Sequence, residues 1–466
     1  MHIRRTLFTF LLFFTAFSLS IYSYAQQDLS RTRPVIPYNH PKLAAPPGMV
    51  YIPGGSTTIK YSQSSTDTNS KKKVSLSSYF IDKTEVTNQQ YRQFVEWVID
   101  SVAITAYLKD DKYFLENKSG DSTKKRINWA KVNHKKIWES RDEDVKNKLQ
   151  PMYENGEIRK DLYTFAFTYL KAVGTNSKTK VGEYVTEPVN VYPDEKIWAK
   201  DLANSQTEVL VENYFTAPPY DDYPVVGVNW KQANAFAYWR SNVGIEFNDI
   251  ADYMKYYHLS YSLPSEAQWV YAAQENVDDN PANPDDDNNS TPAATISTSD
   301  STGTGSKDST AMAAAVAQAP AIDSTPVDRD KDGLLANFKQ DEGDYTEDGS
   351  AFTLPVMSYA PNKFGVYNMV GNVSEWVLDA YSPSAYAFVS DVNPVLLYDA
   401  DSSDADAMKR KVVRGGSFMS NAKSLSPYYR DLELQNVSHC YIGFRCVMQA
   451  PEILTKKVKT RKKRRA

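Results

Sequence analysis

Cysteine is scarce in this chain of 466 residues, which contains only Cys440 and Cys446. If the residues between them form one extended strand, their Cα atoms lie roughly 20 Å apart. That separation is far beyond the reach of a disulfide bond. We therefore expect no disulfide framework, so stability has to come from a buried core or from a bound metal.

Histidine is equally sparse. His2, His40, His134, His258 and His439 are scattered, and no pair of them has the spacing of a metal site. The chain also lacks a Gly-x-Ser-x-Gly elbow and a Walker-type phosphate loop. Its net charge is only −4 at pH 7, which argues against a general nucleic-acid binder. No familiar catalytic set is visible.

Long apolar runs are lacking as well, with one exception at the N-terminus. Arg4 and Arg5 precede an apolar stretch at residues 7–22, and Ser23-Tyr24-Ala25 follows as a small-x-small cleavage signature. This order is typical of a secretory signal peptide, so we predict cleavage after Ala25 and export of the chain. No cysteine lies near this site to accept the acyl chain of a lipoprotein.

Short strands bounded by turn residues are predicted at several places. After a proline-rich leader at residues 26–47, residues 49–55 read as a strand that ends in Gly54-Gly55. Residues 74–81 alternate moderately and predict a second strand. Residues 225–228, Val-Val-Gly-Val, predict a short buried strand.

Three helices are predicted from capping residues that precede apolar side chains at helical spacing. The first begins after Thr87, the second after Asn229 and the third after Ser265. Gln90 and Gln268 complete capping boxes with Thr87 and Ser265. The expected inward faces are, in order, Tyr91, Phe94, Val95 and Val98; Ala233, Phe236, Ala237 and Arg240; and Trp269, Ala272 and Ala273.

Two insertions and a basic tail interrupt this pattern. Residues 101–219 are charged and rich in Lys and Tyr, with helical periodicity around 137–149 and 162–173, so we predict a partly helical insertion. Residues 275–327 are of low complexity and cannot bury enough apolar surface to offset the entropy of ordering, which predicts a disordered loop. The basic tail at residues 451–466 either meets anionic lipid headgroups or an acidic protein, or is a solvated terminus.

Seven short sequence blocks follow one another between residues 48 and 450. They are Gly-Met-Val-Tyr-Ile-Pro-Gly-Gly (48–55), Asp-Lys-Thr-Glu-Val-Thr-Asn (82–88), Pro-Val-Val-Gly-Val-Asn-Trp (224–230), Leu-Pro-Ser-Glu-Ala-Gln-Trp (263–269), Gly-Val-Tyr-Asn-Met-Val-Gly-Asn-Val-Ser-Glu-Trp (365–376), Arg-Gly-Gly-Ser (414–417) and Ile-Gly-Phe-Arg-Cys (442–446). In this order they resemble the formylglycine-generating-enzyme, or sulfatase-modifying-factor, domain family. The resemblance implies an α+β fold, related to C-type lectins, with little regular secondary structure and long insertions.

Within that family, the details look closer to GldK and PorK, proteins of gliding motility and type IX secretion. The matching features are the long insertion after the first helix and the motifs at residues 191–194, 222–228 and 441–445. This resemblance implies a periplasmic component that associates with the outer membrane. It would form a homo-oligomeric ring with a GldN- or PorN-like protein partner. Those proteins are usually lipoproteins, whereas no lipid-accepting cysteine is visible here, so the resemblance does not account for membrane attachment.

Copper chemistry is the activity that the resemblance would bring. The family's enzymes oxidise a substrate cysteine with copper held by two thiolates, and soft thiolates suit Cu(I). The two cysteines would follow the Arg-Gly-Gly-Ser turn, but residues 418–436 contain no sulfur except Met419. Cys446 matches a structural position, and Cys440 lies outside the ligand positions. We therefore predict no copper and no enzyme activity.

Calcium is the metal that the resemblance retains, because hard cations prefer mixtures of carboxylate, amide and carbonyl oxygens. The matching positions are Asn368, Gly371, Val373 and Glu375 for a second site, and Asn337, the Phe338 carbonyl, Asp348 and the Ser350 carbonyl for a first. One or two ions are expected. The alternative is that Asn368 and Asn372 only cap turns while Glu375 pairs with an arginine such as Arg414.

The leading hypothesis is a non-catalytic structural subunit of a type IX secretion or gliding-motility complex. Two alternatives stay open. One is a formylglycine-generating-type oxidase with an altered cofactor that acts on protein cysteine. The other is a calcium-dependent carbohydrate- or peptide-binding module, which the relation to lectins suggests.

Overall fold

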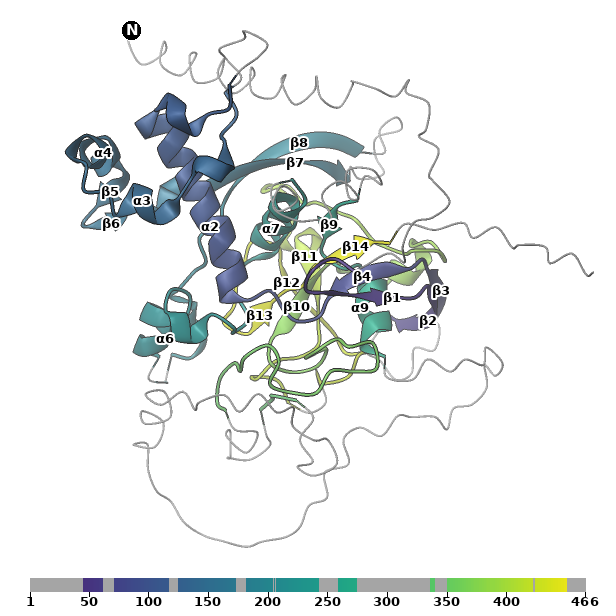
Figure 1. Cartoon of the computed structure of the whole chain (residues 1–466). Coiled ribbons are helices and arrows are strands. Elements are labelled where there is room, and N and C mark those ends of the chain that lie inside the picture. Colours follow the sequence, from purple (N-terminus) through teal and green to yellow (C-terminus); the bar gives the residue numbers. More distant parts are fainter. Residues whose placement is uncertain are drawn as a thin grey trace, which may run out of the picture. The chain divides into compact units, whose positions relative to one another are not determined.

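The computed structural model describes residues 45–61, 71–116, 125–172, 182–203, 205, 207–242, 259–274, 336–339, 350–421 and 424–450 (Figure 1). The predicted signal peptide, the predicted loop at 275–327 and the basic tail lie outside these residues. The chain divides into two compact units, with residues 100–153 in one and residues 45–99 and those from 154 onward in the other.

Two four-stranded sheets form the framework of the larger unit. One has the order β1-β4-β14-β9, and the other β12-β11-β10-β13. In the first, β4 pairs antiparallel with both β1 and β14, so the two ends of the described chain meet in one sheet (Figure 1). The strands are β1 Met49–Ile52, β4 Tyr79–Asp82, β9 Tyr261–Ser262, β10 Ser374–Ala380, β11 Arg410–Arg414, β12 Arg430–Leu434, β13 Ile442–Gly443 and β14 Val447–Gln449.

Two hairpins add to this framework. Strands β2 (Gly55–Lys60) and β3 (Lys71–Leu76) pair with each other, as do β7 (Thr164–Ala172) and β8 (Gly182–Asn190). The shortest strands are β5 (Tyr153–Glu154) and β6 (Glu157–Ile158). The prevalence of such short elements agrees with the α+β fold expected from the sequence.

The three capped helices are confirmed. Thr87 and Gln90 exchange backbone and side-chain hydrogen bonds at the start of α2, as do Asn229 and Gln232 before α7. Ser265 and Gln268 form the capping box of α9. The helices are α2 Asn88–Val102, α3 His134–Trp138, α4 Glu143–Leu149, α5 Ile197–Asp201, α6 Glu208–Asn213, α7 Trp230–Asn242 and α9 Glu266–Ala273. Within the described ranges, no helix is long and apolar enough to cross a membrane.

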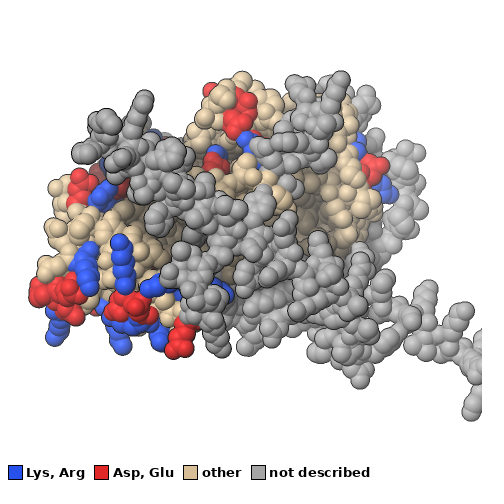
Figure 2. All heavy atoms as spheres, turned by 90° about the horizontal axis from the view of Figure 1, so that it is seen from above, with Lys and Arg blue, Asp and Glu red and all other residues tan. Residues whose placement is uncertain are grey.

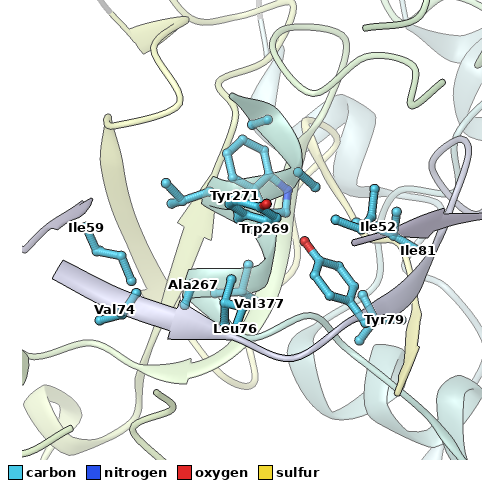
Figure 3. Packing of buried hydrophobic residues seen from close by; sticks show 14 of the residues in the cluster. Ile52, Ile59, Val74, Leu76, Tyr79, Ile81, Ala267, Trp269, Tyr271 and Val377 are labelled. Atoms are coloured by element: carbon cyan, nitrogen blue, oxygen red, sulfur yellow. The ribbon is translucent and has the colours of Figure 1, made fainter. Parts of the chain in front are cut away.

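The main core lies between α9 and the strands around it. Trp269 is completely buried there with Tyr79, whose hydroxyl donates to the Gln268 carbonyl at 2.7 Å. Figure 3 shows Ile59 and Val74 of the β2–β3 hairpin pointing toward this cluster. A second group of aromatic side chains joins α2 to α7. There the Tyr91 ring stacks on the Phe236 ring with 5.6 Å between the ring centroids. Aromatic pairs of this kind contribute about 0.5–1.5 kcal/mol each beyond the area they bury.

Two strand predictions are wrong in detail. Residues 74–81 do not form one strand, because the chain leaves the β2–β3 hairpin at Ser77 and Ser78 and then enters the first sheet as β4. Residues 225–228 are buried but lie in no sheet. Gly227 has φ of +71°, and the Val225 and Gly227 amides donate to the separate carbonyls of Val86 and His439. A left-handed residue in the middle breaks the ladder that a strand needs.

The insertion at residues 101–219 is partly helical, as predicted, with α3, α4, α5 and α6 inside it, but one of its two periodic stretches is not a helix. Helices α3 and α4 cover the periodic stretch around 137–149, but residues 162–173 contain the strand β7 instead of a helix. Phe165 and Phe167 are at alternate positions of β7, and their rings stack on one side of the strand. The centroid of the Phe165 ring lies 5.3 Å from that of Phe94 in α2. Pairing with β8, which no local pattern reveals, decides between helix and strand here.

Candidate functional site

A tight turn that leads into β10 holds Asn368, Gly371 and Val373 of the predicted second calcium site, and the fourth residue, Glu375, lies in β10 itself. Asn368, Gly371 and Asn372 all have positive φ, at +49°, +78° and +60°. Only glycine fits at position 371, because an added Cβ would lie 2.6 Å from the Asn337 carbonyl oxygen. The turn is therefore built against residue 337, which belongs to the predicted first site.

Glu85, a residue that the sequence did not single out, lies at the centre of this turn. Its carboxylate is completely buried and accepts from the Asn368 amide at 3.1 and 3.2 Å and from the Asn372 amide at 2.9 Å. Burial raises the pKa of Glu85 to about 7, the charge of Glu375 adds to the rise, and Arg445 opposes it. Both asparagines thus bind a buried acid.

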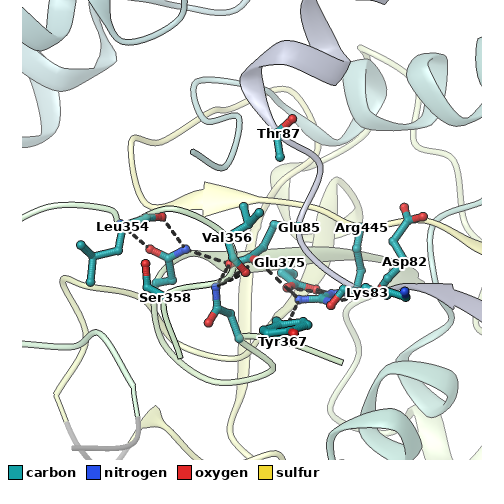
Figure 4. A network of polar contacts seen from close by, with 12 residues as sticks. Asp82, Lys83, Glu85, Thr87, Leu354, Val356, Ser358, Tyr367, Glu375 and Arg445 are labelled. Atoms are coloured by element: carbon teal, nitrogen blue, oxygen red, sulfur yellow. Dashed lines mark hydrogen bonds and ion pairs between the residues drawn. The ribbon is translucent and has the colours of Figure 1, made fainter. Parts of the chain in front are cut away.

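Glu375 has a cationic partner at this point. Arg445 donates from Nε to both carboxylate oxygens at 2.8 and 2.9 Å, and from Nη2 to Oε1 at 2.6 Å (Figure 4). The Trp269 indole donates to Oε2 at 2.8 Å. Arg445 Nη2 also lies 3.9 Å from Glu85 Oε2. One arginine therefore serves two buried carboxylates.

The arginine named as the alternative partner of Glu375 has another role. Arg414 is opposite Glu375 in the β10–β11 register, but its guanidinium binds Glu266. Arg430 donates to the same carboxylate from Nε at 2.7 Å and from Nη2 at 3.0 Å. Burial pushes the pKa of Glu266 up, but the two arginines outweigh it and the pKa is lowered. Burial also raises the pKa of nearby Asp379 to about 7, with Glu266 contributing.

The predicted first calcium site is partly described. The backbone carbonyl of Asn337 accepts from the backbone N–H of Asn372 at 2.8 Å. The side-chain nitrogen of Asn337 donates to the Phe352 carbonyl at 2.7 Å. Phe338 is buried beside it, and Ser350 Oγ accepts from the Phe352 amide at 3.1 Å. Asp348 lies outside the described residues. The structure thus brings Asn337 together with the turn at 368–375.

The fit to calcium differs between the two predicted sites. Asn337 Oδ1 is buried and has no hydrogen-bond partner in the described part of the chain, so a bound cation would satisfy it. Glu375 is less suited, because Arg445 and Trp269 use its oxygens. No three His, Cys, Asp or Glu side chains in the described ranges are arranged around a metal position. Calcium stays a prediction, which amide and carbonyl oxygens at the first site suit better.

The two cysteines lie in different surroundings. Cys440 is buried with Trp198 and Phe418, and its Sγ is 4.0 Å from Met419 Sδ. Cys446 follows Arg445, and its amide donates to Asp82 Oδ2 at 2.9 Å. Burial raises the pKa of the Cys446 thiol to about 12, and it raises that of Cys440 well above its ordinary value. Both groups are therefore protonated thiols near neutral pH.

His439 lies between two carboxylates, an arrangement that the sequence analysis does not predict. His439 Nε2 lies 2.9 Å from Glu433 Oε2, and its Nδ1 lies 3.1 Å from Asp201 Oδ1. Burial alone would lower the pKa of His439, but hydrogen bonds to the two carboxylates raise it. The one sequence signal for Glu85 is its place in the block at residues 82–88. Partners such as Arg445 and Asp201 have no local signal.

Comparisons with known proteins agree with the resemblance noted in the sequence. Residues 37–450 match the sequence profile of the Sulfatase-modifying factor enzyme 1-like domain. The formylglycine-generating enzyme of Streptomyces coelicolor is 35% identical over 107 residues, 22% of this chain and 32% of that protein. The serine/threonine-protein kinase pkn1 of Chlamydia pneumoniae is 26% identical over 229 residues, 49% of this chain and 24% of that protein.

One solved structure is also similar over most of the chain. PvdO from Pseudomonas aeruginosa is 15% identical, and the alignment covers 86% of this chain and 94% of PvdO with a TM-score of 0.38. The two sequence relatives are matched over a smaller share, since this chain covers about a third or less of the length of the formylglycine-generating enzyme and of pkn1.

Proposed function

Because the chain belongs to the sulfatase-modifying factor enzyme 1-like domain family, we propose that it uses this fold as a non-catalytic structural subunit. The complex in question is a type IX secretion or gliding-motility assembly of the periplasm and outer membrane. In it the chain would form a ring with a protein partner.

The observation that carries the proposal is the absence of a thiolate pair where the family's oxidases would bind copper. Residues 418–436 contain no cysteine, and the thiols of Cys440 and Cys446 are both buried with raised pKa values. The resemblance implies that the family's oxidases hold copper(I) with two thiolates at one position, which soft sulfur ligands suit. Cys440 lies beside Met419 and Cys446 beside Asp82, so each thiol serves local packing instead.

The polar interior supports a rigid scaffold. Glu85, Glu375 and Arg445 connect the segment after β4, strand β10 and the segment after β13, while Glu266, Arg414 and Arg430 connect α9, β11 and β12. Charges buried in this way are costly unless every partner is in place. Such networks therefore tie distant segments to one geometry. If calcium binds, Asn337 is the side chain best placed to hold it, and the ion would add a further crosslink.

Three of the motifs on which the proposed closeness to GldK and PorK depends are neighbours in the fold. The motifs at residues 191–194, 222–228 and 441–445 lie together. The Asp194 amide donates to the Gly227 carbonyl at 2.9 Å, and a Cβ added at Gly443 would lie 3.0 Å from the Val225 carbonyl oxygen. An added Cβ at Gly227 would lie 2.7 Å from the Asp194 carbonyl oxygen. These three motifs thus form one contiguous part of the fold.

The test is purification of the tagged chain from its own envelope with mild detergent, followed by native mass spectrometry. We expect an assembly of repeated copies with one principal partner, and loss of protein secretion when the gene is deleted. A monomer without an envelope partner, together with normal secretion after deletion, would refute the proposal.

A second measurement addresses the oxidase alternative. The purified chain is incubated with copper, oxygen and a cysteine-containing peptide, and the peptide mass is followed. We expect no conversion by the wild type or by the Cys440→Ser/Cys446→Ser variant. Conversion by the wild type that the variant lacks would establish an oxidase with a different ligand set.

A further inference from the structure

The imidazole of His439 connects two segments that are far apart in the sequence. Its Nδ1 lies 3.1 Å from Asp201 Oδ1, and its Nε2 lies 2.9 Å from Glu433 Oε2. Asp201 is the last residue of α5, and Glu433 belongs to β12. The three side chains are only 13–24% exposed, so water competes weakly for their hydrogen bonds. We call this group of three side chains the His439 bridge.

The His439 bridge requires a protonated imidazole. A neutral imidazole has one N–H, so it can donate to only one of the two carboxylates, and the lone pair of its other nitrogen would face the second. The imidazolium has two N–H groups and donates to both. Burial alone would lower the pKa of His439, but the hydrogen bonds to Glu433 and Asp201 raise it. The folded chain therefore keeps this proton to a higher pH than the unfolded chain does.

The ionised groups that face His439 are acidic. Acidic and basic side chains are interspersed on the face of the molecule drawn in Figure 2. At the His439 bridge, by contrast, neither Asp201 nor Glu433 forms an ion pair with a lysine or arginine within the described ranges. Asp431, also in β12, interacts with the charge of Glu433, and the uncharged ring of Tyr441 stacks on the imidazole with 4.6 Å between the centroids. Loss of the proton would therefore leave these carboxylates without the cation between them.

The carboxylate of Asp201 also holds α5 over a buried thiol. Its Oδ2 accepts from the backbone N–H of Cys440 at 2.7 Å. The Cys440 side chain is completely buried in a cluster that includes Ile197 and Trp198 of α5. Helix α5 has only five residues, which is too short for a helix to be stable by its own backbone hydrogen bonds. Its position therefore depends on these contacts and on the His439 bridge.

From this geometry we propose that the His439 bridge is a pH-sensitive switch that opens α5. With His439 protonated, α5 is held against β12 and covers the Cys440 thiol. Loss of the proton breaks one of the two hydrogen bonds, and α5 is released. Because the pKa is higher in the closed state, the stabilisation is fully present below the ordinary value of 6.5 and is lost as the pH rises through the raised value.

The test is the labelling of Cys440 with iodoacetamide in the purified chain, from about pH 6 to about pH 9. Dividing the rate by that of the urea-unfolded chain at the same pH cancels the ionisation of the thiol and gives the open fraction. Peptide mass spectrometry reads Cys440 and Cys446 separately. Relative to Cys446, which is buried beside Asp82, the ratio for Cys440 should rise by up to about tenfold per pH unit. An equal rise at both cysteines would mean that the whole unit unfolds and would overturn the proposal.

Two variants should change this response in opposite directions. In Glu433→Gln, the glutamine amide can donate to Nε2 of a neutral imidazole whose Nδ1–H still binds Asp201, so the ratio should stay low to about pH 9. His439→Gln should already show the high alkaline ratio of the wild type near pH 6. The matched control is His134→Gln, which removes an imidazole that contacts a carboxylate in the other compact unit and should follow the wild type.

The isosteric variant decides the outcome even if His439→Gln does not fold. A ratio that rises with pH in Glu433→Gln as it does in the wild type would contradict the proposal, because the carboxylate would then not matter. A wild-type ratio that is constant with pH would contradict it as well. The measurement contains no partner protein, so its outcome is independent of the proposed secretion role.

Discussion

Arg445 encloses the carboxylate of Glu375, with Nε 2.8 and 2.9 Å from the two oxygens and Nη2 2.6 Å from Oε1. Gly443, in the parallel strand β13, is opposite Glu375, and the arginine two residues later reaches back to it. Both side chains are removed from water, and Glu85 is within 3.9 Å of the same guanidinium. The position of Arg445 therefore decides whether two buried acids are compensated.

Removal of this cation should be costly. In Arg445→Leu, Glu375 and Glu85 stay buried without a counter-charge, and breaking a buried pair in this way costs about 3–5 kcal/mol. Urea unfolding measures the loss. The control is Lys146→Leu, which breaks an exposed pair with Glu143 and should cost less than about 1 kcal/mol. Equal losses for the two variants would show that the buried network contributes no more than a surface pair.

Glu85 should make the protein less stable as the pH rises through the mildly acidic range. Burial raises its pKa from the ordinary value of 4.5 to about 7 in the folded state. Between these values the folded chain binds more protons than the unfolded chain, so the free energy of unfolding falls with increasing pH. The pKa difference corresponds to about 3 kcal/mol.

The variant Glu85→Gln isolates this effect. We consider the free energy of unfolding of Glu85→Gln minus that of the wild type. This difference should rise by about 3 kcal/mol as the pH increases from about 4.5 to about 7, because the neutral amide does not titrate. Urea titrations across this range give the difference, in which the contribution of Asp379 cancels. Glu143→Gln, which removes an exposed carboxyl group, is the surface control. Parallel curves for Glu85→Gln and wild type would mean that Glu85 keeps an ordinary pKa.

Gly371 should tolerate no side chain. Its φ is +78°, and a Cβ would lie 2.6 Å from the Asn337 carbonyl oxygen and 2.8 Å from the Ala336 Cβ. Gly156 is the matched control, since its φ is +87° but nothing lies within 4 Å of an added Cβ. Both alanine variants carry the backbone strain, about 1–2 kcal/mol. Gly371→Ala should lose roughly 1–3 kcal/mol more in thermal or urea unfolding. Equal losses would contradict the close approach of residues 336–337.

The sequence predicts what is local in this fold. Thr87 with Gln90, and Ser265 with Gln268, are three residues apart, so one helical turn brings each pair together whatever surrounds it. The break at Ser77 depends instead on two different partner strands. Arg414 is opposite Glu375 in the sheet, yet the guanidinium that binds Glu375 is that of Arg445. Such choices depend on several segments at once, which no single-sequence pattern contains.

Calcium should stabilise the folded chain through Asn337. Its Oδ1 is buried without a partner among the described residues, and a cation would satisfy it. Addition of calcium to EDTA-treated protein should therefore raise the free energy of unfolding by about 2.7 kcal/mol at about 100 times the dissociation constant. Calorimetry with and without calcium measures this increment. Asn337→Ala should abolish it.

Two control variants separate this site from general destabilisation. Thr353→Val removes a buried hydrogen bond to Tyr214 and should lower stability but keep the calcium increment. Glu375→Gln weakens the contact with Arg445, and the increment should also survive, because the oxygens of Glu375 already bind Arg445 and Trp269. Loss of the increment in Glu375→Gln with its retention in Asn337→Ala would place the ion at the turn 368–375 instead. No increment in the wild type would remove calcium from this fold.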